Sequence, residues 1–287
     1  MNARPDERLT NAVFSSPNCD GSFAPDFADY LGDLGAMRPS VVLAFAPKAA
    51  GTYLRSAAVA AVGGSFVRTV HAQGGRDASF YLPTFLLYYA GGFPARPLVT
   101  HVHMQALPAN RHFIETLGLK PTIMIRAIPD MLASYADMLD DDPASPDNWL
   151  NIRLPQNYTG LPQQAKNDFL VDMIGPWYAS YFATWMEYAA EAPDKICVLD
   201  YDGFLTDPVA TLETLLNHAG LPRSRDLCQL ALDAVWENRS DFRYNKGVNG
   251  RGQARFTADQ IARLQRQLDF YPNLFDIKAK LIPPSAS

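Results

Sequence analysis

Short apolar runs recur along the chain and predict β-strands that are buried on both faces. They occupy residues 40–46, 65–70, 97–103, 121–126 and 196–201. Each run is rich in apolar or β-branched residues, as in strands of a covered parallel sheet. Helical segments separate or follow them, at residues 129–139, 169–190, 208–219 and 225–237 and after Thr257. Strands that alternate with helices predict an α/β fold, a single domain with a central, mainly parallel sheet flanked by helices.

Two stretches lack this periodicity. Residues 1–38 hold scattered aromatic residues among Pro, Asp and Gly, and we expect an irregular N-terminal arm packed on a domain of residues 39–287. Residues 140–164 are rich in Asp, Pro and Asn. A loop of that length is usually functional or disordered, so we predict a lid. The aromatic residues crowded on the helix at 169–190 are more typical of a core than of a ligand platform.

The composition narrows the classes of partner. Of 287 residues, 48% are hydrophobic and 19% are charged, as in a well-packed globular protein. A net charge of −5 argues against broad nucleic-acid binding, which needs a basic face. The N-terminus lacks the apolar core of a signal peptide, and no stretch reaches the ~18 apolar residues of a membrane span. The 3 cysteines are far apart and lack the spacing of a disulfide framework or a metal site. We therefore expect a reducing compartment and a cytoplasmic protein. Its oligomeric state stays open, with a homodimer as one alternative.

The most informative stretch follows the first predicted strand. Residues 47–52 read PKAAGT and lead into an Ala-rich helix. A strand that turns directly into a helix points unpaired N–H groups and the positive end of the helix dipole at one spot, where small residues let an anion approach. Lys48 adds a full positive charge, so we interpret the segment as a P-loop-like phosphate-binding loop, although a plain connection has a similar pattern. It differs from the NTPase loop because its lysine precedes Gly51 and no Lys-Ser or Lys-Thr pair follows to hold magnesium.

Four chemically versatile residues end predicted strands: Lys48, His101, Arg126 and Tyr201. Ligands of a doubly wound sheet bind beyond the carboxyl ends of its strands, so we expect these side chains at one edge. Two cations, an imidazole and an aromatic ring suit an anionic nucleotide beside a proton acceptor. This favours phosphoryl or sulfuryl transfer with no obvious metal site. His101 and His103 share one face of a strand and are an alternative zinc pair, but no third ligand stands out.

Several further motifs, each defined by the spacing of its residues, resemble those of a known protein family. Arg126 ends a strand, and Ser134 follows it by eight residues. A Thr-His pair at 100–101 precedes a Leu-Pro element at 107–108, and a Lys-Gly-x-x-Gly loop occupies residues 246–250. Together with the PKAAGT loop, these motifs make the chain resemble, over residues 40 to about 260, the sulfotransferases that use 3′-phosphoadenosine-5′-phosphosulfate (PAPS).

The resemblance implies roles around PAPS and its product, 3′-phosphoadenosine 5′-phosphate (PAP). The N–H groups of the first loop and Thr52 would bind the 5′-phosphate, and Lys48 would reach the bridging oxygen. Arg126 and Ser134 would hold the 3′-phosphate, with the basic loop closing over it, and Tyr201 would lie near the adenine. The implied ligands of PAPS are Lys48, Ala50, Gly51, Thr52, Tyr53, Arg126, Ser134, Tyr201, Lys246 and Gly247.

Three positions depart from the family pattern. Val99 stands where a lysine commonly precedes the Thr-His pair. Asn245 replaces an arginine of the basic loop, so we expect Arg243 or Arg251 to meet the 3′-phosphate instead. Gly252 stands where a tryptophan is usual.

The resemblance also implies a mechanism. His101 would act as general base on an acceptor hydroxyl, and Lys48 would neutralise charge on the departing phosphate, without a metal. His103, Phe80, Phe85 and Tyr89 would line a pocket for a small apolar or aromatic alcohol or phenol. Two alternatives remain. One is a non-catalytic PAPS- or PAP-binding protein, which would need no base. The other is a small-molecule kinase on a P-loop-type fold, which the missing magnesium-binding pair disfavours.

Overall fold

The chain folds around one parallel sheet. The computed structural model describes residues 29, 31–33, 36, 39–70, 79–81, 83, 96–141, 152, 154–238 and 249–284. Within these residues, a 5-stranded sheet has the order β2-β3-β1-β4-β5, with every pairing parallel. The strands are β1 (Ser40–Leu43), β2 (Ser65–Phe66), β3 (Leu98–His101), β4 (Pro121–Ile125) and β5 (Cys197–Asp200). The predicted α/β fold with a central parallel sheet is confirmed.

The register of the strands gathers the predicted site residues at one edge. Leu43 at the end of β1 lies beside His101 of β3 on one side and beside Thr122 of β4 on the other. Ile125 at the end of β4 lies beside Asp200 at the end of β5. Because the strands run in the same direction, the segments that follow them meet beyond a common edge, where ligands bind in this class of fold.

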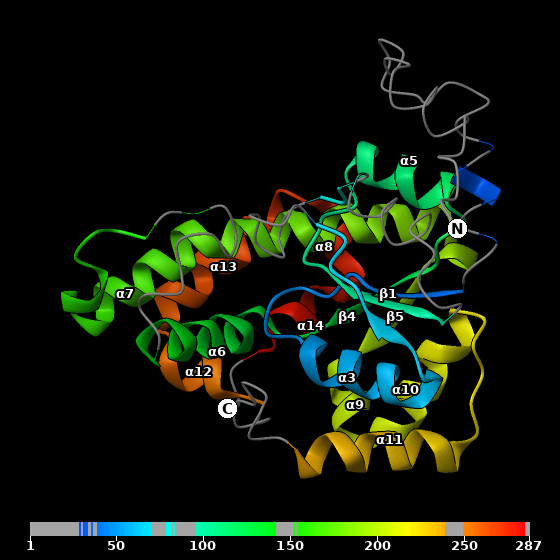
Figure 1. Cartoon of the computed structure of the whole chain (residues 1–287). Coiled ribbons are helices and arrows are strands. Elements are labelled where there is room, and N and C mark those ends of the chain that lie inside the picture. The colour runs from blue at the N-terminus through cyan, green and yellow to red at the C-terminus, as the bar shows by residue number, and fades with distance from the viewer. Residues whose placement is uncertain are drawn as a thin grey trace.

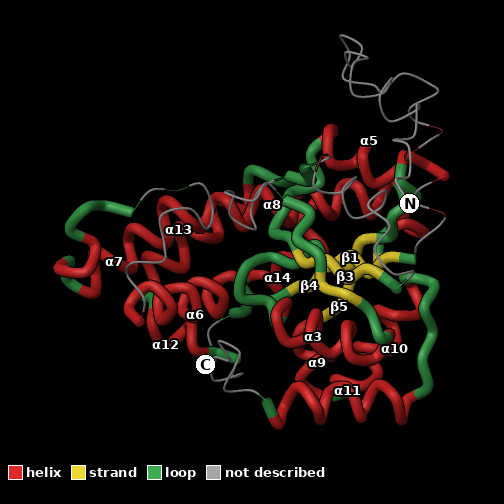
Figure 2. The backbone as a smooth tube through the Cα atoms, in the orientation of Figure 1, coloured by secondary structure: helices red, strands yellow, loops and turns green. Residues whose placement is uncertain are grey.

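Helices cover both faces of the sheet. In Figures 1 and 2 one group lies below the sheet, a second lies above it, and a third forms a lobe to the left. The lower group is α3 (Gly51–Val62), α9 (Tyr201–Thr206), α10 (Pro208–His218) and α11 (Arg225–Glu237). The upper group is α5 (Pro108–Thr116) and α8 (Gly175–Glu191). The lobe contains α6 (Ile128–Asp141), α7 (Gln163–Phe169), α12 (Arg251–Arg255) and α13 (Ala258–Asp269).

Shorter helical turns complete the described chain. A π-helical turn, Leu170–Ile174, joins α7 to α8, so the predicted helix at 169–190 is the later part of a longer helical segment. The other turns are the 3₁₀ segments Tyr158–Gly160, Pro193–Lys195 and Pro272–Ile277, and the terminal α14 (Lys278–Leu281). No helix among the described residues is long and apolar enough to cross a membrane.

The aromatic stripe of α8 forms core, as its helical spacing predicted. Tyr178, Tyr181, Phe182 and Trp185 are each 0% exposed, and Trp177 stacks on Tyr181. Burial raises the pKa of Tyr181 well above its ordinary value because a charged phenolate would lose its hydration. The stripe packs on the side of the sheet that faces α8.

Several boundaries differ from the sequence prediction. The strand predicted at 65–70 is hydrogen-bonded as a strand only over Ser65–Phe66. The strand predicted at 196–201 ends at Asp200, because the Asp200 carboxylate accepts the N–H groups of Asp202 and Gly203 and so starts α9 at Tyr201.

The predicted arm and lid fall largely outside the described residues. Of the arm, residues 1–28, 30, 34–35 and 37–38 lie outside, and of the lid, 142–151 and 153 do. The described ends of the lid segment are the last turn of α6, the Tyr158–Gly160 turn and the start of α7. Tyr158 is 3% exposed, so that part of the segment packs against the domain. The lid itself stays a prediction.

Candidate active site

The loop between β1 and α3 has an unusual backbone. Lys48 and Ala50 have φ values of 65° and 61°, in the left-handed region that costs energy for residues other than glycine. Helix α3 begins at Gly51, and within the described chain no side chain caps its first N–H groups and no acidic residue occupies its first turn. The amide donors and the positive end of the helix dipole at this helix start therefore suit an anion.

Side chains from distant segments hold the carbonyl groups of this loop. Four carbonyls between residues 44 and 48 accept such hydrogen bonds. The pairs are Tyr181 Oη to Ala44, His103 Nδ1 to Phe45 at 2.7 Å, Tyr178 Oη to Pro47 at 3.1 Å, and Arg126 Nη1 to Lys48. These side chains satisfy carbonyls of the loop and hold its shape, while the Ala49 N–H donates to the Ala46 carbonyl at 3.3 Å.

His101 lies directly against the start of α3. A Cβ atom added to Gly51 would lie 2.2 Å from His101 Nε2 and 2.4 Å from Cε1, far inside van der Waals contact. The imidazole is 4% exposed and meets Phe45 edge to face, with ring centroids 6.4 Å apart. The predicted base and the predicted anion-binding loop are therefore adjacent, and Gly51 is the residue that permits their close approach.

His103 is buried behind His101. It is 3% exposed, and its ring stands perpendicular to that of His101 with 4.8 Å between centroids. Because the Phe45 carbonyl can only accept, His103 Nδ1 carries the proton of their hydrogen bond. His103 thus supports the loop through the Phe45 carbonyl, and its predicted contact with the acceptor stays a prediction. Among the described residues no group of three or more His, Cys, Asp or Glu is placed to hold a metal ion.

Arg126 connects the loop to Tyr201. Its guanidinium carbon lies 3.9 Å from the centroid of the Tyr201 ring, a cation–π contact, while Nη1 donates to the Lys48 carbonyl. The side chain is 8% exposed, and its Nε makes no hydrogen bond within the described chain. A buried guanidinium N–H without an acceptor suits an anionic ligand. Ser134 lies on α6, 4% exposed.

The basic loop is only partly described. Lys246 and Gly247 lie outside the described residues, as does Arg243. Arg251, the other candidate for the missing arginine, pairs through Nη2 with the Asp137 carboxylate of α6. Gly252 packs so tightly against Pro129 that an added Cβ would lie 2.2 Å from the Pro129 carbonyl carbon, which leaves no room for a tryptophan.

Other predicted site residues have clear positions. The Tyr53 hydroxyl donates to the Leu232 carbonyl of α11 at 3.3 Å, and its ring lies 6.0 Å from that of Phe204. Tyr53 therefore anchors α3 on α11 through its side chain. Phe80 stacks on Phe113 of α5 at 5.1 Å. Phe85 and Tyr89 lie outside the described residues.

Comparison with solved structures places this arrangement in a known fold. Mouse sulfotransferase SULT7A1 in complex with PAP matches with a TM-score of 0.58 and 14% sequence identity, over 86% of this chain and 90% of that chain. The chain has the sulfotransferase fold. A retinol dehydratase in complex with retinol and PAP matches with a TM-score of 0.49 and 12% identity, over 88% of this chain and 86% of its own. That score is too low to add to the assignment. No protein-family model and no curated protein matches the sequence.

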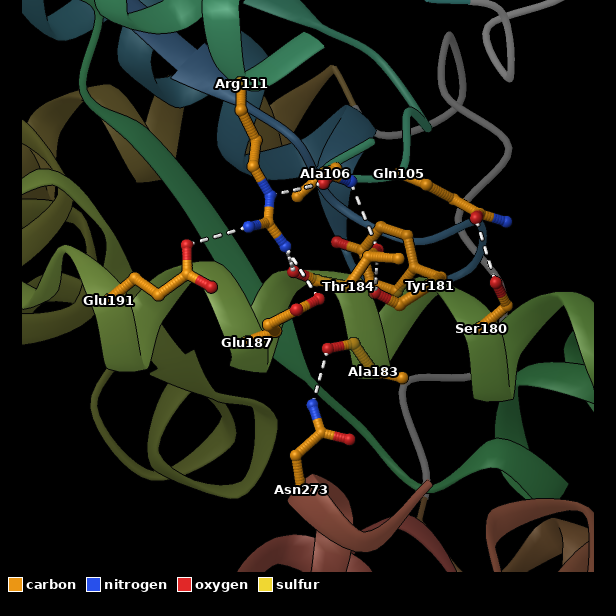
Figure 3. Close-up of polar contacts among 10 residues, drawn as sticks. All are labelled: Gln105, Ala106, Arg111, Ser180, Tyr181, Ala183, Thr184, Glu187, Glu191 and Asn273. Carbon is orange, nitrogen blue, oxygen red and sulfur yellow. Dashed lines mark hydrogen bonds and ion pairs between the residues drawn. The ribbon is translucent and has the colours of Figure 1, made fainter. Parts of the chain in front are cut away.

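Within this sulfotransferase fold, α8 also holds the segment that follows His101. Figure 3 shows Arg111 of α5 donating from Nε to the Ala106 carbonyl at 2.6 Å and from Nη2 to the Thr184 carbonyl at 3.1 Å. The same guanidinium pairs with Glu187 and Glu191, each at 2.9 Å. These contacts bind residues 102–107 to the helix and so fix the chain beside the imidazole.

Sequence reasoning missed this support. Two further contacts reinforce it in Figure 3: Ser180 Oγ donates to Gln105 Oε1 at 3.0 Å, and the Ala106 N–H donates to Thr184 Oγ1 at 3.2 Å. In addition, Trp185 Nε1 donates to the Met104 carbonyl at 2.9 Å. The sequence did contain a signal for it, because the aromatic stripe of α8 includes Tyr178, Tyr181 and Trp185, whose buried rings carry polar groups. Buried polar tips of this kind need partners, and here the partners are carbonyls of the site loops.

Proposed function

We propose that the protein transfers the sulfuryl group of PAPS to a hydroxyl of a small apolar or aromatic acceptor, with His101 as general base. The observation that carries the proposal is the contact between His101 and Gly51. It brings a proton acceptor next to the start of a helix whose N–H groups suit an anion. A transfer between a bound phosphosulfate and a hydroxyl needs both groups in one place.

The residues of the site fit PAPS at both of its anionic ends. We assign the 5′ end to Lys48 and to the start of α3, where no side chain of the described residues caps the helix and where the carbonyls of Pro47 and Lys48 are bound by Tyr178 and Arg126. For the 3′-phosphate there is Arg126, with its buried Nε, and Ser134 on the following helix. PAPS supplies the activated sulfuryl group. The fold shared with a PAP-bound sulfotransferase supports the same ligand.

The roles of the protein's residues follow from their chemistry. His101 accepts the proton of the acceptor hydroxyl while that oxygen forms its bond to sulfur and the sulfur–oxygen bond to the phosphate breaks. Lys48 and the loop N–H groups stabilise the negative charge that collects on the leaving phosphate. His103 holds the Phe45 carbonyl and the edge of the His101 ring.

Two other functions make different predictions about ligands. A kinase on a similar loop would bind ATP with magnesium, whereas a PAPS-binding regulator would bind PAP and turn nothing over. Thermal shift with PAP against ATP, each with and without magnesium, separates the kinase from the other two. We expect PAP to raise the melting temperature without magnesium and ATP to have little effect. A shift that appears only with magnesium and ATP would contradict the proposal.

Turnover distinguishes an enzyme from a regulator. A panel of phenols and small apolar alcohols incubated with radiolabelled PAPS should yield a labelled product. The variant His101→Ala should lower kcat by about 10²–10⁴-fold, the usual contribution of a general base, with little change in PAP affinity. His218→Ala is the matched control, since His218 bonds to the carbonyl of Lys195, just before β5 and so at the opposite edge of the sheet. Turnover by His101→Ala within a few-fold of wild type would exclude His101 as the base.

The proposed class of acceptor rests mainly on the amino-acid composition of the chain. Phe80 packs on Phe113, next to a stretch that is rich in aromatic residues in the sequence. Aromatic residues in this part of the chain favour a phenol or an apolar alcohol over a polysaccharide, for which an acidic chain is also poorly suited. Labelling of charged sugars but of no phenol or apolar alcohol would contradict this part of the proposal.

A further inference from the structure

The ring of His103 contacts both the anion-binding loop and the proposed base. His103 is 3% exposed, and its Nδ1 donates to the Phe45 carbonyl of the loop after β1 at 2.7 Å. The same ring stands at 90° to the ring of His101, with 4.8 Å between the two centroids. One nitrogen of the imidazole therefore binds the loop, while the ring itself packs against His101.

The register of two central strands brings these residues together. Leu43 of β1 lies beside His101 of β3, and the two strands are parallel. Phe45 and His103 each come two residues later along the chain. Side chains two apart on an extended chain point to the same face, so His103 follows His101 on one face and reaches the loop beside it. The side chain of His103 thus joins the segments that leave β1 and β3.

Three neighbours enclose the imidazole of His101. Phe45 meets it edge to face, His103 stands perpendicular to it, and a Cβ atom added to Gly51 would overlap it. The ring is also 4% exposed, and a close-packed interior leaves such a side chain few orientations. Phe45 has an apolar side chain and Gly51 has none. His103 is therefore the neighbour that links the base to the loop by a side-chain hydrogen bond.

The backbone around His103 is held independently of its side chain. The Val102 N–H donates to the Leu43 carbonyl at 3.0 Å, and Trp185 Nε1 of α8 donates to the Met104 carbonyl at 2.9 Å. These bonds fix the chain on both sides of residue 103. A substitution of His103 should therefore leave the backbone in place and change only what the imidazole does.

We infer that His103 is a positioning residue that places the general base and the phosphate-binding loop together, through two different parts of one ring. Its Nδ1–H group sets the shape of the loop through the Phe45 carbonyl, and its ring sets the orientation of His101. The role is indirect, because His103 acts through these two groups and not on the reacting atoms. The inference rests on the proposed function, since it takes His101 as the base and PAPS as the donor.

Two substitutions separate the donor from the ring. The asparagine side chain has an N–H donor bonded to Cγ, as histidine Nδ1 is, but has no ring. Phenylalanine keeps a ring and has no donor. We expect His103→Asn to keep the PAP dissociation constant within about twofold and to lower the single-turnover rate at saturating PAPS by about tenfold or more, because His101 is free to turn. We expect His103→Phe to raise the PAP dissociation constant by about fivefold and to keep the rate within about threefold.

His218→Phe is the matched control. It removes another hydrogen bond from a histidine ring to a backbone carbonyl, that of Lys195 at 3.2 Å, just before β5 and so at the opposite edge of the sheet. It should leave both the PAP dissociation constant and the rate at their wild-type values. His103→Leu removes donor and ring together and should show both losses. If one of the first two variants does not fold, the other and His103→Leu carry the test, with circular dichroism as the check of folding.

The ligand-free protein gives a readout that does not depend on activity. Long-range ¹H–¹⁵N spectra of the histidine rings should show a proton on His103 Nδ1, since the Phe45 carbonyl can only accept. An Nδ1 atom without a proton would contradict the hydrogen bond to the loop and overturn the inference.

Three kinetic results would also overturn it. The first is a pair of folded variants, His103→Asn and His103→Phe, that both keep the wild-type affinity and rate. The second is an equal loss of affinity and rate in both variants, which would show a general structural effect. The third is a higher KM for the acceptor with unchanged kcat, which would support contact with the acceptor instead. A wild-type protein that does not bind PAP would overturn the proposed function, so the two failures are distinct.

Discussion

The substitution Gly51→Ala tests the geometry of the site with one added carbon. The new Cβ would lie 2.2 Å from His101 Nε2, whereas ordinary van der Waals contact begins at 3.4 Å. The imidazole must then move by about 1.2 Å (3.4 − 2.2) or turn away. Displacement of a reacting group by about 1 Å costs about 10²-fold in rate. We therefore expect kcat to fall by about 100-fold.

The backbone at Gly51 should tolerate alanine. Its φ is not among the positive values in the described chain, and the residue is the first of α3. Alanine is up to about 1 kcal/mol more favourable than glycine inside a helix. The loop N–H groups are unchanged, so PAP affinity should stay within a few-fold of wild type. Because the imidazole that must move is buried, the added carbon should also cost about 1–3 kcal/mol of stability. The folded protein should therefore show the effect in kcat and not in donor binding.

The assay is single-turnover sulfuryl transfer at saturating PAPS, with the best acceptor found by screening, together with PAP titration and thermal denaturation. Gly160→Ala is the control, because a Cβ there meets nothing within 4 Å. A folded Gly51→Ala protein with a rate within threefold of wild type would refute the reasoning. If PAP affinity fell as far as the rate, the added carbon would be acting on the loop and not on His101.

Two further substitutions test the surrounding structure. Tyr178→Phe leaves the Pro47 carbonyl without its donor. It should lower the free energy of unfolding by about 1–3 kcal/mol and weaken PAP binding, as measured by denaturant unfolding and PAP titration. Unchanged values would contradict a role of Tyr178 in holding the loop. Hydrogen bonds from Gln260 and Arg263 lower the pKa of Asp168. The ionised carboxylate therefore stabilises the fold at pH values above its ordinary pKa near 3.8, and this contribution is lost as the pH falls through the lowered pKa. Asp168→Asn should therefore lower the melting temperature at pH 7, with the difference shrinking toward pH 3; a constant difference would argue against the carboxylate.

The sequence predicted the sheet and its edge because both depend on local patterns. Apolar runs ending in Lys48, His101, Arg126 and Tyr201 are visible without a structure, and parallel strands then bring these ends together. The predicted α/β fold and its parallel sheet follow from the same alternation. The ends of the strands were predicted less well. Tyr201 was predicted to end a strand but begins α9, because the Asp200 side chain accepts the N–H groups of the residues that follow. Apolar periodicity does not reveal such a contact.

Other parts of the site depend on contacts between segments far apart in the chain. Nothing in the spacing of residues 169–190 indicates that the Tyr178 hydroxyl meets the Pro47 carbonyl, 131 residues away. Likewise, Asp130 meets Gly252 across 122 residues. Helical spacing correctly predicted that the aromatic face of α8 is buried. The partners of its polar tips depend on how α8 crosses the loops, which is set by the packing of the whole domain.

The strained loop also explains why so many of these contacts are to carbonyl groups. Left-handed backbone at Lys48 and Ala50 persists only where the surroundings over-determine it. The donors come from α8, from the segment after β3 and from the end of β4, so the loop acquires its shape once these elements have packed together. A ligand then meets N–H groups that are already oriented and has little chain to order on binding. Substitutions in α8 that touch no ligand should therefore alter donor binding through the shape of the loop.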